Sequence, residues 1–244
     1  MQIERLTGKN GTYLNLYPKG EYDPTEYERP TVTVDTCICT VMNSQLKVLL
    51  IKRNNAPFKG KWAIPGGFVN IKDMEDIDDA STRELKEETG VTGITVRQLH
   101  TYGKAKRDPR WRTVDIAYYA LVPINIIQSQ KIKADDDASD YQWFSLSDLP
   151  KLGFDHVTIL TDLRNRLIDQ INYSPIGFEL VGKRFTWNEL QNAYESVLGR
   201  NLIASNFRRV IKRMYIIEEC SEMVKNNAGR PAMLLKFSGA KSNF

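Results

Sequence analysis

The chain has 244 residues, too many for one typical domain and about right for two. Hydrophobic residues make up 41% of it and charged residues 26%, which allows packed cores beneath an ordinary water-exposed surface. No run approaches the roughly 20 apolar residues that span a bilayer, and the polar start, Met1 to Gly11, lacks the apolar run of a secretion signal. Because Cys37, Cys39 and Cys220 lack the spacing of a metal site, we expect buried, reduced thiols in a cytoplasmic protein.

The net charge of +4 is distributed unevenly along the chain. From Pro175 to the end there are 11 basic and 6 acidic residues, whereas the part before it has 23 basic and 24 acidic ones. A nearly neutral first part and a basic last part indicate different partners for the two.

The first part of the chain alternates predicted strands with predicted helices. Gly, Asn and Pro are scattered through residues 1–30, where we expect an irregular N-terminal extension. Gly90 suits the left-handed position that follows a helix end. We expect a first domain over residues 31–153 and a connector helix within residues 154–174. The expected strands cover residues 31–42, 46–53, 96–102, 113–122 and 141–144, and the expected helices cover 77–89 and 155–172.

The last part, residues 175–244, has the element order of a winged helix domain. Thr186 and Glu189 have the spacing of a capping box at the start of a helix. A second helix and two strands around a basic, polar turn follow, and in that order the second helix is the one that reads DNA. The predicted helices and strands cover residues 187–198, 205–214, 215–217 and 233–237.

The second of these helices alternates apolar and basic residues. Its first residues would meet base edges, and basic residues on the wing would lie next to phosphates or the minor groove. The alternative is a basic amphipathic helix on a dimerisation module. The candidate DNA-binding residues are Asn206, Arg208, Arg209, Lys212 and Arg213 on the helix, and Lys225 and Arg230 on the wing.

The helix expected over residues 77–89 is strongly acidic. Glu84, Glu87 and Glu88 are three and four positions apart, so their carboxylates share one helix face. Three like charges are unfavourable together unless a cation neutralises them, and hard oxygen ligands suit Mg²⁺ or Mn²⁺. The alternative is a solvated acidic face with no ligand.

The residues around this helix resemble the Nudix hydrolase signature. The chain matches every fixed position of the signature from Glu75 to Val91, but seven residues rather than five separate Gly67 from Glu75. An insertion there is tolerable because it precedes the helix that carries the ligands. The resemblance implies the Nudix fold, an α-β-α sandwich of the α+β class with a mixed sheet.

The resemblance also implies roles for individual residues. Glu84, Glu87 and Glu88 would be the metal ligands and catalytic residues, with Mg²⁺ or Mn²⁺ as cofactor. In this family the metals polarise a diphosphate and activate water, so a nucleoside diphosphate linked to another group is cut within its pyrophosphate. Structural roles in the signature would fall to Gly67, Glu75, Arg83 and Gly90, with Arg83 paired to Glu75.

Two further stretches resemble the ADP-ribose branch of the family. In the turn Arg107-Asp108-Pro109-Arg110, the candidate substrate-binding residues are Arg107 and Arg110; the alternative is an ordinary charged hairpin. In the acidic loop before Tyr141, Asp136 or Asp137 would be a catalytic base or extra metal ligand; the alternative is a solvated loop. Aromatic residues that could stack on adenine, or else belong to the core, are Phe68 and Tyr118.

Nearly the whole chain resembles the Nudix-related transcriptional regulators, such as those of NAD metabolism and of sugar catabolism. Besides the signature, short motifs occur in the family's order: Tyr22-Asp23-Pro24, Phe154-Asp155-His156 and Gly229-Arg230-Pro231-Ala232. We interpret His156 as a structural or interface residue. Such regulators generally form homodimers, as two recognition helices reading successive major grooves require. Several have lost metal-binding glutamates, whereas all are present here.

Three hypotheses follow for the function. The first is a bifunctional protein that hydrolyses or at least binds ADP-ribose, or a related nucleotide, and binds an operator in a ligand-dependent way. The second is an ADP-ribose pyrophosphatase whose tail does not bind DNA. The third is a catalytically silent repressor that senses a sugar or a metabolite of NAD. The intact signature argues against the third hypothesis, and the basic tail argues against the second.

Overall fold

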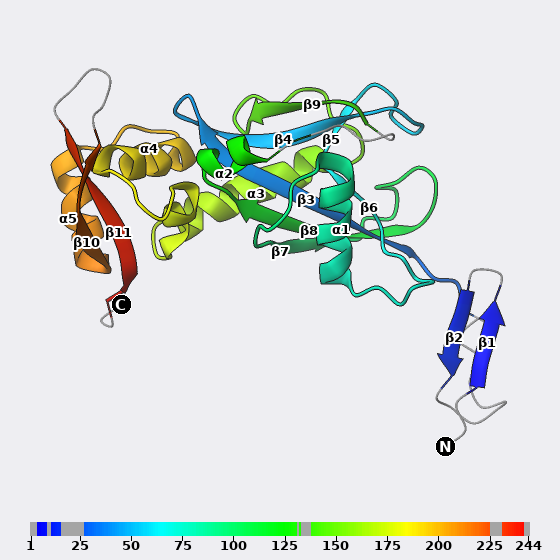
Figure 1. Ribbon diagram of the computed structural model, residues 1–244. Coiled ribbons are helices and arrows are strands. Elements are labelled where there is room, and N and C mark those ends of the chain that lie inside the picture. The colour runs from blue at the N-terminus through cyan, green and yellow to red at the C-terminus, as the bar shows by residue number, and fades with distance from the viewer. Residues whose placement is uncertain are drawn as a thin grey trace.

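The computed structural model describes residues 4–8, 11–15, 27–130, 132, 138–224 and 231–241, and the burial of side chains from residue 27 onward (Figure 1). Figure 1 shows a sheet flanked by helices, a smaller body formed by the C-terminal elements, and an N-terminal hairpin that stands apart from the sheet. In the described part of the chain, no helix is long and apolar enough to cross a membrane.

A mixed sheet forms the larger body. Its central strand, β3 (Thr31–Met42), pairs in parallel with β8 (Thr113–Leu121) and antiparallel with β4 (Gln45–Arg53). β-branched residues occupy much of β3 and suit a strand that is covered on both faces. The remaining strands of the sheet are β5 (Trp62–Ala63), β6 (Gly66–Phe68), β7 (Arg97–Tyr102) and β9 (Ala138–Ser145).

Two helices cover opposite faces of this sheet (Figure 1). Successive side chains of β3 point to opposite faces, so Cys37 packs in the apolar cluster that includes α3 (His156–Gln170). Ile38 packs in another cluster with Leu85 of α1 (Ile77–Thr89). The arrangement is the α-β-α sandwich with a mixed sheet that the sequence predicts.

The expected left-handed residue ends α1. Gly90 has φ 73°, and its backbone N–H donates to the carbonyl of Lys86. This conformation costs glycine little because it has no Cβ. The end of the acidic helix is therefore fixed at the residue where the sequence places it.

The C-terminal body is a winged helix, as predicted. Its first helix begins with a complete capping box between Thr186 and Glu189. Phe207 and Ile211 of the second helix are buried against the first. The elements are α4 (Trp187–Leu198), α5 (Ala204–Met214), β10 (Tyr215–Val224) and β11 (Ala232–Ala240), preceded by the 3-10 helix η2 (Pro175–Leu180).

Several short elements differ from the sequence prediction. The prediction of an irregular N-terminus is wrong for β1 (Glu4–Gly8) and β2 (Gly11–Asn15), which form an antiparallel hairpin. Each of these strands has only five residues, so the alternation of apolar and polar residues gives little signal in the sequence. The prediction also lacks β5, β6, η2 and α2 (Ile124–Ser129), which span too few residues to show a period.

The thiols are unpaired, as expected, but they differ in burial. Cys37 and Cys39 are fully buried in β3, and burial raises the pKa of the Cys39 thiol to about 12. Cys220 is partly exposed in β10, so the expectation of a buried thiol is wrong there.

The two bodies share one apolar core. The cluster that contains Leu50 of β4 and Leu163 of α3 continues through Leu190 of α4 to Phe207 of α5. The winged helix is therefore packed onto α3 and the sheet, rather than joined to them only by a linker.

Candidate functional site

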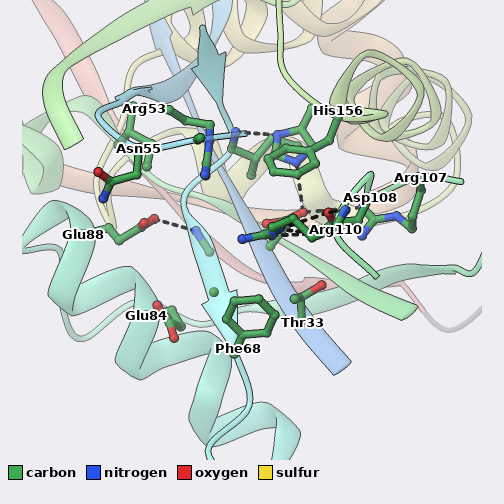
Figure 2. Close-up of a pocket in the computed structure, with 17 residues that line it drawn as sticks. Thr33, Arg53, Asn55, Phe68, Glu84, Glu88, Arg107, Asp108, Arg110 and His156 are labelled. Carbon is green, nitrogen blue, oxygen red and sulfur yellow. Dashed lines mark hydrogen bonds and ion pairs between the residues drawn. The ribbon is translucent and has the colours of Figure 1, made fainter. Parts of the chain in front are cut away.

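A polar cavity of about 330 Å³ lies at one end of the Nudix-like sheet. Figure 2 shows Glu84 and Glu88 of α1 on one side of it, with Arg107 and His156 on the opposite side. Strands β3, β4 and β6, the loop before β8 and the start of α3 supply the other walls. The cavity is large enough for a small ligand.

Two glycines bring β6 into direct contact with the acidic helix. The backbone N–H of Gly66 donates to Glu88 Oε2 at 2.6 Å. A Cβ on Gly66 would overlap the backbone of Val34 and Asp35, and a Cβ on Gly67 would overlap the carboxylate of Glu84 and push it aside. The Gly67 position of the signature is thus explained by packing against a glutamate.

Arg83 ties the loop after β6 to α1, as the resemblance implies. Its guanidinium donates to both carboxylate oxygens of Glu75, at 2.6 and 2.9 Å, and the pKa of Glu75 is lowered by this pairing. The same group donates to Glu84 Oε1 at 2.8 Å and Glu87 Oε2 at 2.7 Å. The two additional residues before Glu75 do not prevent this clamp from forming.

The glutamates differ in their environments. Burial raises the pKa of Glu88 to about 8; the N–H of Gly66 opposes the shift, and Glu84 and Asp35 add to it. Burial also raises the pKa of Glu84, against the influence of Arg83. The side chain of Glu87 is 52% exposed and paired with Arg83. The structure therefore brings Glu84 and Glu88 into the cavity and leaves Glu87 outside its lining.

The donor set suits a divalent cation that a ligand helps to coordinate. Within the described residues, no three His, Cys, Asp or Glu side chains form a complete metal-binding group. Two carboxylates, Glu84 and Glu88, nevertheless face the same cavity, and their raised pKa values reflect negative charge that burial disfavours. Mg²⁺ is commonly held by one or two carboxylates together with phosphate oxygens and water.

Arg110 lies beside two aromatic rings of the cavity. Its guanidinium is 5.2 Å from the ring centre of Phe68 and 5.6 Å from that of Phe154, and it is paired with Asp108 at 2.7 Å. Its side chain is 41% exposed, so it remains accessible to a ligand. Tyr118, in contrast, is buried outside the cavity lining, and its hydroxyl donates to Asp78.

Arg107 lines the same cavity but is held by acidic neighbours. Its side chain is 4% exposed, and it donates to the two carboxylate oxygens of Asp155 at 3.0 and 2.8 Å. It also lies 3.6 Å from Asp115 and 3.9 Å from Asp35. Of the two arginines that the sequence suggests, Arg110 is therefore the one better exposed to a ligand.

Several residues that line the cavity are not predicted from the sequence, and two of the predicted catalytic residues lie outside the described part of the chain. His156 is the first residue of α3, and its ring stacks on Phe154 at 5.2 Å between centres. The Phe154-Asp155-His156 triplet marks this place in the sequence, although not its role. Unanticipated lining residues are Asp35, Arg53 and Asn55, whereas Asp136 and Asp137 lie outside the described residues.

The exposed side of α5 divides into two faces. Arg208 and Lys212 each lie 5.7 Å from the ring centre of Trp187, at the start of α4. Arg209 donates to Asn206 Oδ1 at 3.3 Å on another face of the helix. The exposed Arg213 is four positions after Arg209 and thus shares its face. Lys225 and Arg230, the expected wing residues, lie outside the described residues.

Comparison with known proteins supports both parts of this description. A Nudix domain family model matches residues 32–163, and the NrtR DNA-binding winged helix domain model matches residues 177–237. The chain is 36% identical over 220 residues to the ADPR responsive transcriptional repressor NtrR of Acinetobacter baylyi, over 89% of this chain and 86% of that protein. It is 40% identical over 136 residues to the ADP-ribose pyrophosphatase of Methanocaldococcus jannaschii, over 56% and 74% of the two chains.

Solved structures give the same relationship. The crystal structure of Shewanella oneidensis NrtR complexed with a 27mer DNA has a TM-score of 0.72 and 33% identity, over 85% of this chain and 93% of that chain. The Nudix domain of that protein complexed with ADP ribose has a TM-score of 0.54 and 36% identity, over 60% and 94% of the two chains. The chain therefore belongs to the Nudix family, in the branch whose members carry an NrtR winged helix domain after the Nudix domain.

Proposed function

We infer that the protein is an ADP-ribose-responsive transcriptional repressor, in which the Nudix domain binds the metabolite and the winged helix binds operator DNA. The observation that carries this conclusion is similarity to a repressor of this kind over 89% of the chain, through both domains. The alternative of a pyrophosphatase with an unrelated tail does not account for the match to a DNA-binding winged helix domain.

The chemistry of the cavity supports ADP-ribose as the ligand. Glu84 and Glu88 would hold Mg²⁺ against the diphosphate, because a divalent ion can join carboxylate and phosphate oxygens. Arg110 has free donor capacity near the open side, and the 46% exposed ring of Phe68 offers a surface for stacking. Arg107 would hold the wall of the cavity through Asp155 instead of binding the ligand directly.

We also propose that the protein hydrolyses ADP-ribose, since none of the three signature glutamates is replaced. A bound divalent ion would neutralise the diphosphate and activate water. In the reaction, water oxygen bonds to one phosphorus and the bridging P–O bond breaks, which yields AMP and ribose 5-phosphate. In the protein, Gly66 orients Glu88, and Arg83 orients Glu84. Glu87 would become available to the metal after release from Arg83.

The two faces of α5 suit different parts of a DNA duplex. Asn206 and Arg209 begin the face directed away from the protein core, where a recognition helix enters the major groove. Arg208 and Lys212 are held towards α4, a position suited to phosphate contacts. We propose a homodimer, since two such helices would read two half-sites about one helical turn apart.

Equilibrium binding tests the regulatory function. Duplexes that bind the full chain are first selected from a random library, and their affinity is then measured by fluorescence anisotropy with and without ADP-ribose and Mg²⁺. We expect specific binding that falls steeply with salt and weakens when ADP-ribose is added. Selection without any enriched sequence, or an affinity that ADP-ribose leaves unchanged, would contradict the proposed regulation.

Turnover tests the enzymatic part separately. AMP release from ADP-ribose is measured with Mg²⁺ for the wild-type protein and for Glu88→Gln. We expect turnover that the substitution reduces by at least about 100-fold, because it removes a charged ligand at the diphosphate. If the protein binds ADP-ribose without turnover, the hydrolase proposal is wrong, whereas the proposal that the Nudix domain senses ADP-ribose stands.

A further inference from the structure

We propose that His156 is the positioning residue through which occupancy of the Nudix cavity reaches the winged helix. The inference rests on the proposed function and assigns a regulatory path to it. His156 begins α3, lines the ligand cavity and is buried, with 4% of its side chain exposed. It thus belongs both to the site and to the helix on which the winged helix packs.

A three-residue segment connects His156 to the acidic helix. The backbone N–H of Ile64 donates to His156 Nδ1 at 2.8 Å, and the N–H of Gly66 donates to Glu88 Oε2 at 2.6 Å. The peptide between them is short and includes Pro65, whose ring restricts its backbone. A ligand that moves Glu88 or β6 therefore also displaces the donor of His156 (Figure 2).

The opposite side of the imidazole faces the cavity floor. Because Nδ1 accepts a hydrogen bond, Nε2 of the neutral ring carries the proton, and it lies 3.3 Å from Asp35 Oδ2. The preceding residue, Asp155, accepts both hydrogen bonds from Arg107. The first turn of α3 is thus attached to the ligand cavity through its own side chains.

The other end of this path is the shared apolar core. Leu160 and Leu163 of α3 are buried in the same cluster as Leu190 and Val197 of α4. Packed interiors transmit small displacements because they contain little free volume. A shift of α3 therefore changes the position of α4, against which the recognition helix is packed.

Helix α3 has other attachments that do not pass through the cavity. The hydroxyl of Tyr102 donates to Asp162 at 3.0 Å, and Arg166 donates to the carbonyl of Leu99 at 3.4 Å. With these and its buried leucines, α3 remains folded when the imidazole is removed. Removal of the imidazole is therefore expected to abolish the effect of ADP-ribose on DNA affinity, while both binding sites remain.

The test measures coupling, defined as the DNA dissociation constant with saturating ADP-ribose and Mg²⁺ divided by that without ligand. For full-length wild-type protein we expect a ratio between about 5 and 150. His156→Ala brings the ratio close to one, measured at an ADP-ribose concentration raised until it saturates the variant, while the variant still binds ADP-ribose and still binds DNA. His156→Asn keeps an acceptor where Nδ1 lies and restores part of the ratio.

A matched control is present in the chain. His100, the other histidine, is exposed in β7 outside the cavity lining, so His100→Ala leaves the ratio at the wild-type value. Reciprocal titration, ADP-ribose with and without DNA, gives the same ratio for each variant. If both His156→Ala and His156→Asn bind ADP-ribose and DNA and keep the wild-type ratio, the role of His156 is wrong, and the proposed function is unaffected. A wild-type ratio of one would instead overturn the proposed function, and this inference with it.

Discussion

Burial opposes the ionisation of Glu88. The charged form of this side chain therefore destabilises the metal-free protein. Its pKa is raised from 4.5 to about 8. Between these values the unfolded chain has released a proton that the folded chain retains, so the free energy of unfolding decreases as the pH rises through this window. Glu88→Gln removes this loss and still offers an oxygen to Gly66.

We predict that Glu88→Gln is more stable than the wild type at pH 8, by at least about 1 kcal/mol or roughly 2–4 °C in Tm, and similar to it near pH 4.5. Thermal unfolding in a metal chelator at the two pH values measures this. Glu87→Gln is the control, because its carboxylate is half exposed. A difference that does not grow with pH would show that Glu88 ionises freely in the folded protein.

Two neighbouring arginines of α5 have different surroundings and are expected to affect DNA binding differently. We predict that Arg209→Ala costs about 1–3 kcal/mol on the selected duplex and reduces discrimination against altered sequences, because Arg209 lies with Asn206 on the outward face. Arg208→Ala weakens binding to all duplexes similarly and lowers the salt slope by about one, because Arg208 lies against Trp187. Competition and salt titrations distinguish the two results; equal loss of discrimination in both variants would contradict the division.

At the scale of elements, a capping box formed by neighbouring residues fixes the start of α4, the helix against which the recognition helix α5 packs. Thr186 accepts from the N–H of Glu189 at 3.2 Å, and the Glu189 carboxylate accepts from the N–H of Thr186 at 2.7 Å. We predict that Thr186→Ala lowers the free energy of unfolding by about 0.5–2 kcal/mol. Denaturant titration measures it, with Thr161→Ala on the exposed side of α3 as control. Equal stability of the two variants would exclude a stabilising cap.

The elements that the sequence predicts are those whose signals are local. The acidic helix and α4 each have a helical period and a glycine directly after the last residue, and α4 also has a capping box; both begin and end as expected. The strands β5 and β6 have two and three residues, too few for alternation to appear. The polar contacts around Arg107 and His156 join residues 48 and 92 positions apart, so only the folded chain reveals them.

At the scale of the whole molecule, the common core makes the stability of one domain depend on the other. Leu190 of α4 is fully buried in the cluster that also contains Leu163 of α3 and Leu50 of β4. A cavity at this position is therefore lined by residues of both bodies. Were the domains independent, such a cavity would lower the transition temperature of the winged helix alone.

We predict that Leu190→Ala lowers the free energy of unfolding by about 2–5 kcal/mol, or roughly 5–15 °C in Tm, in a single transition. Calorimetry gives the number of transitions, and the transition whose temperature rises when ADP-ribose is added reports the Nudix domain. Ile203→Ala is the control, because that side chain is 70% exposed. Two separate transitions, of which the substitution shifts only the one that ADP-ribose does not affect, would mean that the domains unfold independently. A shared core could then not transmit ligand binding from α3 to α5.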